Sequence, residues 1–233
     1  MSTIAGNLQA VEATIQVACD AAGRARSTVQ LLAVSKTFPA EAVLEAAACG
    51  QRAFGENYVQ EGVDKIAAVA KALPDARLEW HFIGPIQSNK TRPIATHFDW
   101  VHTVERLKIA QRLSEQRPPG LGPLNVCLQV NISGEASKSG VTPDELPALA
   151  QAVAALPNLR LRGLMAIPEP QADPELQRAP FARQRALAQD LGRAGIQIDT
   201  LSMGMSADMR AAVLEGATIV RVGSAIFGSR HYE

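Results

Sequence analysis

The sequence predicts an α/β protein folded as one (β/α)8 barrel of the TIM type. Its 233 residues alternate short runs rich in β-branched residues with alanine-rich segments of helical periodicity, and eight such units follow an opening helix. Repeated β-α units favour a parallel sheet with right-handed crossovers, and eight of them fit a closed barrel. A doubly wound open sheet is the alternative, weakened because no G-x-G-x-x-G follows the first strand. We expect one domain over residues 1–233.

The first half of the chain supplies the opening helix and four strand-helix units. The helix is expected at 3–22, because Leu8, Val11 and Ile15 fall on one face, and Gly23 is a stop signal. The expected strands are V-Q-L-L-A-V-S at 29–35, a short one at 52–54, L-E-W-H-F-I-G at 78–84 and D-W-V-H-T at 99–103. The helices after them are expected at 39–49, 57–72, 88–96 and 104–116.

The second half repeats the pattern after R-P-P-G-L-G-P, which is short enough to be a surface loop. The expected strands are L-N-V-C-L-Q-V-N-I at 124–132, L-R-L-R-G-L-M-A-I at 159–167, Q-I-D-T-L-S-M at 197–203 and T-I-V-R-V-G-S at 218–224. The helices are expected at 143–155, 174–194 and 207–215, with a short helical turn after the last strand.

Composition excludes several classes of partner. Lys plus Arg and Asp plus Glu each number 23, so there is no basic excess to indicate nucleic acid or an anionic membrane as partner. No apolar stretch approaches the roughly 18 residues that a membrane span needs, and the N-terminus does not resemble a secretory signal. Cys19, Cys49 and Cys127 are far apart, and we expect reduced, core or half-buried thiols. These features predict a cytoplasmic protein.

Chemistry in such a barrel is expected at the carboxyl ends of the strands. Lys36 directly follows an apolar strand there, so its stem would lie among apolar neighbours. Partial desolvation would lower its pKa and free a nucleophilic amine, which can form a Schiff base with a carbonyl ligand. The alternative is a lysine whose stem covers the barrel rim while its head is solvated.

The ends of the seventh and eighth expected strands predict a phosphate-binding site. Backbone N–H groups around Gly223 and Ser224, after Arg221, can hold a phosphate, and Ser206 can cap the next helix and donate its hydroxyl to the same group. The alternative is a plain helix cap and a plain turn. A lysine that forms a Schiff base, opposite a phosphate-binding site, suits a small aldehyde that carries a phosphate, namely pyridoxal 5′-phosphate (PLP).

Other polar residues are weaker candidates. His81 and His102 lie on strands, where a histidine is more often a hydrogen-bonded core residue than an acid or base. Glu61 and Asp64 are most simply a solvated helix face, and Trp80 and Trp100 are most simply core. No His, Cys, Asp and Glu cluster has the spacing of metal ligands.

Seven motifs together resemble the YggS/PROSC family of PLP homeostasis proteins, over nearly the whole chain. They are L-L-A-V-S-K at 31–36, F-G-E-N-Y-V-Q-E at 54–61, W-H-F-I-G-P-I-Q-S-N-K at 80–90, N-I-S-G-E-A-S-K-S-G at 131–140, R-G-L-M-A-I-P at 162–168, L-S-M-G-M-S-A-D-M at 201–209 and R-V-G-S-A-I-F-G at 221–228. The resemblance implies a PLP barrel of fold type III, similar to the N-terminal domain of alanine racemases but without their C-terminal β-domain.

The resemblance also implies roles for single residues. Lys36 matches the Schiff-base lysine, and Arg221 matches the arginine that faces the pyridine nitrogen. Ser206, Gly223 and Ser224 match phosphate-binding positions. Asn57, in the G-E-N-Y motif, is expected to line the pocket. An arginine at the ring nitrogen leaves that nitrogen unprotonated and makes the ring a poorer electron sink.

Three functions compete. The leading one is a non-enzymatic, monomeric PLP carrier that holds PLP as a Schiff base, takes part in intracellular PLP homeostasis and delivers PLP to apo-enzymes. The second is an amino-acid racemase or related PLP enzyme, which needs a second base such as Tyr58 or His81. The third is a PLP-free Schiff-base barrel of the aldolase type. The position of Lys36, with Arg221 and Ser206, favours PLP over the third.

Overall fold

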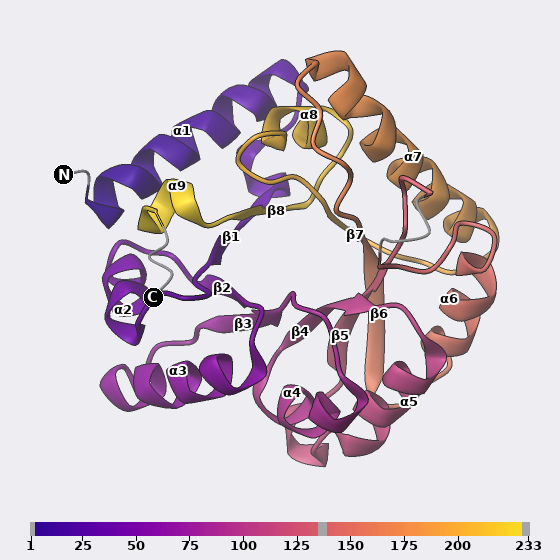
Figure 1. The fold of residues 1–233 in the computed structure, drawn as a ribbon, viewed down its shortest axis with the longest axis horizontal. Coiled ribbons are helices and arrows are strands. Elements are labelled where there is room, and N and C mark those ends of the chain that lie inside the picture. The colour runs from indigo at the N-terminus through magenta and orange to yellow at the C-terminus, as the bar shows by residue number, and fades with distance from the viewer. Residues whose placement is uncertain (1–2, 135–138, 230–233) are drawn as a thin grey trace.

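The polypeptide closes on itself as a ring of eight parallel strands surrounded by helices (Figure 1). The computed structural model describes residues 3–134 and 139–229. The strands follow one another around the barrel in sequence order, and β1 closes the ring by pairing with β8. Their bounds are β1 Gln30–Val34, β2 Ala53–Glu56, β3 Glu79–Phe82, β4 Trp100–Val104, β5 Leu124–Gln129, β6 Leu159–Met165, β7 Thr200–Ser202 and β8 Ile219–Val222. The predicted barrel is therefore confirmed, and the doubly wound alternative is excluded.

The helices form the outer layer of the barrel, as Figure 1 shows. Their bounds are α1 Ile4–Ala21, α2 Ala40–Ala48, α3 Val59–Ala72, α4 Thr91–His97, α5 Leu107–Gln116, α6 Leu146–Ala154, α7 Pro174–Arg193, α8 Met209–Leu214 and α9 Ser224–Phe227. Short 3-10 turns lie at Arg26–Thr28, Ser88–Lys90 and Pro119–Leu121. In the described part of the chain, no helix is both long and apolar enough to cross a membrane.

Helix α1 illustrates how sequence signals fix an element. The Thr3 side chain caps its first turn by accepting a hydrogen bond from the Gly6 N–H at 3.1 Å. Leu8, Val11 and Ile15 are buried on the face that the periodicity predicts. Gly23, just past the helix end, has φ +63°, which suits a residue without Cβ.

Two apolar cores hold the barrel together. The larger lies between the sheet and the helices, and Phe54, Phe82 and Phe98 are among its fully buried side chains. The smaller draws one residue from each of six strands and therefore fills the barrel interior. Its members are Leu32, Ala53, Trp100, Cys127, Met165 and Ile219. A filled interior leaves the ends of the strands as the place for a site.

Several predicted boundaries need correction. Strand seven was expected at 197–203, but only Thr200–Ser202 is a strand. Strand eight ends at Val222, so Gly223 is a turn residue and Ser224 begins α9. The expectation of core or half-buried thiols holds for Cys19 and Cys127, whereas Cys49 is exposed; all three are free.

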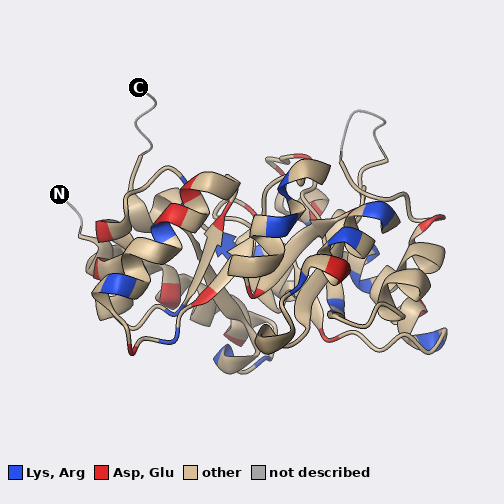
Figure 2. Ribbon diagram, turned by 90° about the horizontal axis from the view of Figure 1, so that it is seen from below, with Lys and Arg blue, Asp and Glu red and all other residues tan. Residues whose placement is uncertain are grey.

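Charged residues of both signs are interspersed over the helices (Figure 2). This mixture agrees with the equal numbers of acidic and basic residues. Among the residues that the structure describes, no group of three His, Cys, Asp or Glu residues is placed to hold a metal ion.

Candidate functional site

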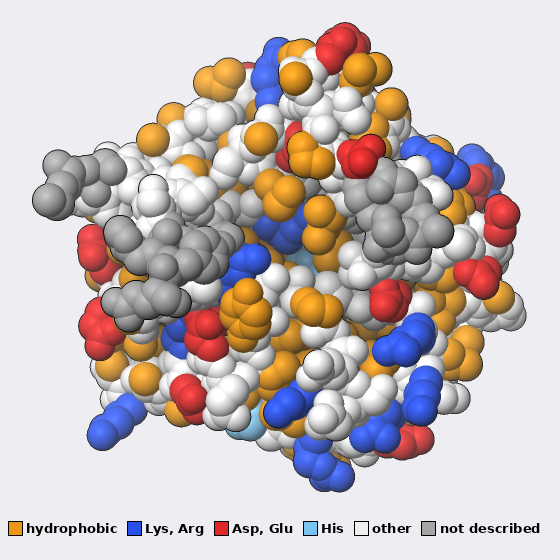
Figure 3. Space-filling view, viewed as in Figure 1, with side chains coloured by type: hydrophobic (Ala, Val, Ile, Leu, Met, Phe, Trp, Pro, Cys, Tyr) orange, Lys and Arg blue, Asp and Glu red, His pale blue; other side chains and the backbone are white. Residues whose placement is uncertain are grey.

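A cavity of about 310 Å³ opens at the carboxyl ends of the strands. The face viewed in Figure 3 is hollowed near its middle, and basic side chains lie in the hollow. The six residues predicted to bind a cofactor all line this one cavity: Lys36, Asn57, Ser206, Arg221, Gly223 and Ser224. The other described lining residues are Val34, Ile83, Ile167, Met205 and Ala207, so the walls are largely apolar.

Lys36 sits in a turn whose backbone is tightly held. It is half-buried and lies two residues after the end of β1. The next residue, Thr37, has φ +67°, a left-handed conformation that costs energy for a residue with a branched Cβ. Its N–H donates to Glu61 Oε1 at 2.6 Å, which offsets that cost and fixes the turn. Glu61, expected on a solvated helix face, is partly exposed and also supports the site.

A buried ionic network lies beneath this turn. The Lys65 ammonium contacts Glu56 Oε1 at 2.6 Å and Glu61 Oε1 at 2.9 Å. It also donates to the Ser35 carbonyl at 2.8 Å, while the Ser35 hydroxyl donates to Glu56 at 2.6 Å. The network thus holds the backbone on both sides of Lys36 by hydrogen bonds. Sequence reasoning missed Lys65, because no local pattern marks a helix lysine that points inward.

Asn57 follows β2 and reaches the cavity because a glycine opposite makes room for its backbone. A Cβ on Gly84 would lie 2.1 Å from the Asn57 carbonyl oxygen, so any side chain there would displace Asn57. Within the described residues, the buried Asn57 Oδ1 has no hydrogen-bond partner. A buried acceptor without a partner in a cavity wall is suited to a polar ligand.

The phosphate side of the cavity differs from the prediction in one respect. Ser206 was expected to cap the helix after strand seven, but α8 begins at Met209 and its N-cap is Asp208. The Asp208 carboxylate accepts from the Met205 N–H at 2.6 Å and closes this loop. Ser206 is exposed in the cavity wall, so its hydroxyl is available to a ligand. On the neighbouring β8 end, Gly223 and Ser224 start the short helix α9.

Arg221 forms the floor of the cavity and is only 5% exposed. Its Nη1 donates to Ser202 Oγ at 2.7 Å, and its Nη2 donates to the Ala166 carbonyl at 3.0 Å. Burial lowers the pKa of the guanidinium to about 10, so the group remains a cation at neutral pH. Two anchors on a planar group fix the direction in which its remaining N–H bonds point.

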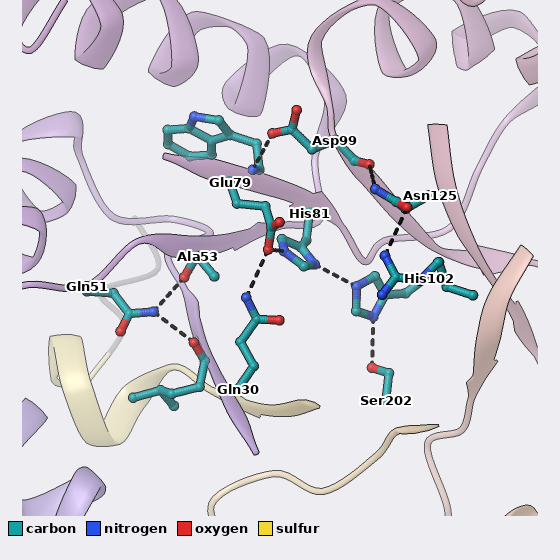
Figure 4. Close-up of polar contacts among 12 residues, drawn as sticks. Gln30, Gln51, Ala53, Glu79, His81, Asp99, His102, Asn125 and Ser202 are labelled. Atoms are coloured by element: carbon teal, nitrogen blue, oxygen red, sulfur yellow. Dashed lines mark hydrogen bonds and ion pairs between the residues drawn. The ribbon is translucent and has the colours of Figure 1, made fainter. Parts of the chain in front are cut away.

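The two strand histidines are core residues, as the sequence predicts. His81 and His102 are fully buried and bonded to each other, His81 Nδ1 to His102 Nε2, at 2.8 Å (Figure 4). Neither lines the cavity. Trp80 and Trp100 are also buried, as expected.

The cavity fits PLP by the chemistry of its walls. It offers an amine, a fixed guanidinium, an unpartnered amide oxygen and a serine-glycine rim within one hollow of suitable size. Residues 135–138, which carry part of the motif at 131–140, lie outside the described residues.

Comparison with known proteins agrees with this geometry. The family model described as alanine racemase, N-terminal domain, matches residues 6–231, which gives the class to which this barrel belongs. Within that class, the chain belongs to the family of pyridoxal phosphate homeostasis proteins. The protein of that name from Pseudomonas aeruginosa is 66% identical over 232 residues, covering 100% of this chain and 98% of the relative. The Escherichia coli K12 protein of the same name is 56% identical over 237 residues, covering 100% and 99%.

A solved structure supports the assignment. The structure of PipY from Synechococcus elongatus with PLP bound is 38% identical, covers 97% of this chain and 100% of that chain, and has a TM-score of 0.83. An alanine racemase from Clostridium difficile is 17% identical and matches over 57% of its own length, with a TM-score of 0.73, which shows the fold alone. The resemblance predicted from the sequence motifs is confirmed.

Proposed function

We propose that this protein binds PLP as a Schiff base on Lys36 and takes part in intracellular PLP homeostasis. The observation that carries the proposal is the convergence of Lys36, Arg221 and Ser206, far apart in sequence, on one cavity. The names of the relatives and the PLP-bound PipY structure support it. When bound, PLP supplies an aldehyde that condenses with a lysine amine.

Each residue of the cavity has a distinct task in this proposal. Lys36 provides the nucleophilic amine. Ser206, with the backbone N–H groups at Gly223 and Ser224, would hold the phosphate, since the first N–H groups of a helix turn have no partner within the helix. Arg221 would donate to the ring nitrogen, and Asn57 would offer its Oδ1 to a donor on the ligand.

We further propose that the protein has no substantial catalytic turnover. Racemisation needs two bases, one on each face of the substrate. Of the described residues that line the cavity, only Lys36 has a side chain that can act as a general base, since Arg221 keeps its proton. His81 is fully buried and Tyr58 is 54% exposed outside the cavity wall, so neither is placed as the second base.

Binding and delivery can be tested separately. We expect the unaltered protein and a Lys90→Ala control to take up PLP with a new visible absorption band, and Lys36→Ala to show none. Lys90 is an exposed lysine outside the cavity, which makes it a matched control. Equal bands in all three proteins would refute Lys36 as the site.

For delivery, we propose that the partners are PLP-dependent apo-enzymes. The carrier that delivers PLP to them is proposed to be monomeric and cytoplasmic. The loaded protein should restore activity to an apo-enzyme in the presence of a phosphatase that destroys free PLP. Failure to do so, with binding intact, would reduce the role to storage. Sedimentation of the loaded protein tests the monomer, and a stable dimer would contradict it.

A further inference from the structure

A chain of hydrogen bonds crosses the barrel interior from the cavity to the opposite rim. Arg221 Nη1 meets Ser202 Oγ at 2.7 Å, and Ser202 Oγ meets His102 Nδ1 at 2.8 Å. His102 Nε2 meets His81 Nδ1 at 2.8 Å, and His81 Nε2 meets Glu79 Oε1 at 2.8 Å. Figure 4 shows the part from Glu79 to Ser202.

The chain is buried everywhere except at its far end. Ser202, His81 and His102 are fully buried, whereas the Glu79 side chain is 39% exposed. Glu79 is the first residue of β3 and therefore lies at the amino-terminal rim, away from the cavity. Gln30 holds it there by donating to the same Oε1 at 2.9 Å.

The two ends of the chain determine the direction of every bond. An arginine only donates, so Ser202 Oγ accepts from Arg221. An ionised carboxylate only accepts, so His81 Nε2 carries a proton and donates to Glu79. If both imidazoles are neutral, His81 Nδ1 accepts from His102 Nε2–H, and His102 Nδ1 accepts from the Ser202 hydroxyl. One arrangement of protons therefore satisfies all four contacts.

The charge states agree with this arrangement. Burial lowers the pKa of His81, and burial, with the charge of Arg221 as a further cause, lowers the pKa of His102 well below its ordinary value. The hydrogen bond from His81 holds the pKa of Glu79 at about 2, so this carboxyl is ionised at neutral pH. Both imidazoles are neutral, and the chain runs from a cation to an anion with every donor pointing the same way.

We propose that Ser202, His102, His81 and Glu79 are positioning residues that fix Arg221 as the donor facing the PLP ring. This role rests on the proposed PLP binding. Hydrogen bonds in one direction polarise one another, so the hydroxyl that donates to His102 is a better acceptor for Arg221. Glu79 thereby acts on the cofactor site from the opposite rim of the barrel.

The order of the protons can be measured without the cofactor. Long-range ¹H–¹⁵N NMR of the apo protein, with the imidazole nitrogens labelled, distinguishes the two neutral tautomers and the imidazolium. We expect both His81 and His102 to be neutral with the proton on Nε2 at pH 7. A proton on Nδ1 of either ring, or an imidazolium, would overturn the proposed chain whatever the protein binds.

Variants at the exposed end test the coupling. Glu79→Gln keeps an acceptor for His81, whereas Glu79→Leu removes it, and both changes lie at the partly exposed end of the chain. We expect Glu79→Gln to keep both tautomers and the PLP absorption band, and Glu79→Leu to mix the His81 tautomers and shift the band. Identical spectra for the two variants would overturn the coupling.

Variants at Ser202 test the anchor itself. Ser202→Ala removes one of the two hydrogen bonds that hold Arg221 and should weaken PLP binding roughly tenfold, by the strength of a hydrogen bond to a charged group. Ser202→Thr keeps the hydroxyl and should recover most of the affinity. Equal affinity for Ser202→Ala and the unaltered protein would refute the positioning role. Absence of PLP binding by the unaltered protein would instead refute the proposed function, and with it the positioning role of these residues. The NMR result on the hydrogen-bond chain would still stand.

Discussion

Replacing Lys65 with Met should destabilise the barrel and loosen the turn that carries Lys36. The Lys65 side chain is 4% exposed, and its ammonium contacts Glu56, whose side chain is 0% exposed, at 2.6 Å. The substitution would leave that carboxylate buried without its cation. It would also remove the donor to the Ser35 carbonyl.

The magnitude follows from the burial of the pair. Removing one partner of a buried ion pair costs about 3–5 kcal/mol. Glu56 keeps the Ser35 hydroxyl as a donor, and Glu61 is 33% exposed and can be solvated, so we expect the lower end, about 3 kcal/mol. For a chain of this size, that loss corresponds to a fall in Tm of roughly 6–12 °C.

The loss of stability caused by Lys65→Met should depend on pH. Burial raises the pKa of Glu56, and Lys65 opposes that rise. A carboxyl group with a raised pKa in the folded state binds more protons folded than unfolded. The stability that the Glu56 carboxyl contributes to the folded protein is therefore fully present below the unfolded pKa of about 4.3 and is lost as pH rises through the folded pKa. Without Lys65 the folded pKa rises further, so the deficit of the variant should grow from acidic to neutral pH.

Urea unfolding at two pH values, one below the unfolded pKa of about 4.3 and one near neutrality, measures the effect. Lys71→Met is the matched control, because Lys71 is an exposed lysine in the last turn of the same helix, α3. Adding Glu56→Gln to Lys65→Met should restore part of the stability. The reasoning fails if Lys65→Met and Lys71→Met lose the same stability, or if the deficit of Lys65→Met does not change with pH.

Three further predictions concern the cavity. Ser206→Ala should weaken PLP binding about tenfold without unfolding, because one hydroxyl donor to a charged phosphate is lost; unchanged affinity by absorbance titration would remove Ser206 from the site. Gly84→Ala should lower both Tm and PLP affinity, because its Cβ would lie 2.1 Å from the Asn57 carbonyl oxygen, and a fully stable variant with normal affinity would contradict that close approach. With single L-amino acids in deuterated water, the loaded protein should incorporate deuterium at Cα far more slowly than about 1 per second, whereas faster exchange that Lys36→Ala abolishes would establish an enzyme.

The sequence predicted the fold well, because eight alternating units leave few arrangements for a parallel sheet. Strand seven was predicted too long at its first residues. Asp199, three residues into the expected strand, lies just before β7; its N–H donates to the Arg162 carbonyl at 2.8 Å, and its carboxylate forms an ion pair with the Arg162 side chain. Such a contact between strands cannot be read from local periodicity.

The six residues expected at the candidate site from the strand ends and the family resemblance line one cavity, because strand ends of one barrel meet at one mouth whatever their separation in sequence. Their binding of PLP stays a prediction. The residues that support this cavity were not predicted. His102 lies 100 residues from Ser202 and meets it only because the barrel closes. Glu61 resembled a solvated helix residue, yet the fold places it under Thr37. Interactions of this kind depend on tertiary structure and have no local signature.

Borohydride reduction followed by peptide mapping tests the central claim most directly. The reagent converts a Schiff base into a stable secondary amine and thereby marks the lysine that holds PLP. We predict that the purified protein is yellow, that reduction bleaches it, and that the label is on Lys36. A colourless protein that takes up no added PLP, or a label mainly on Lys90 or Lys138, would contradict the account.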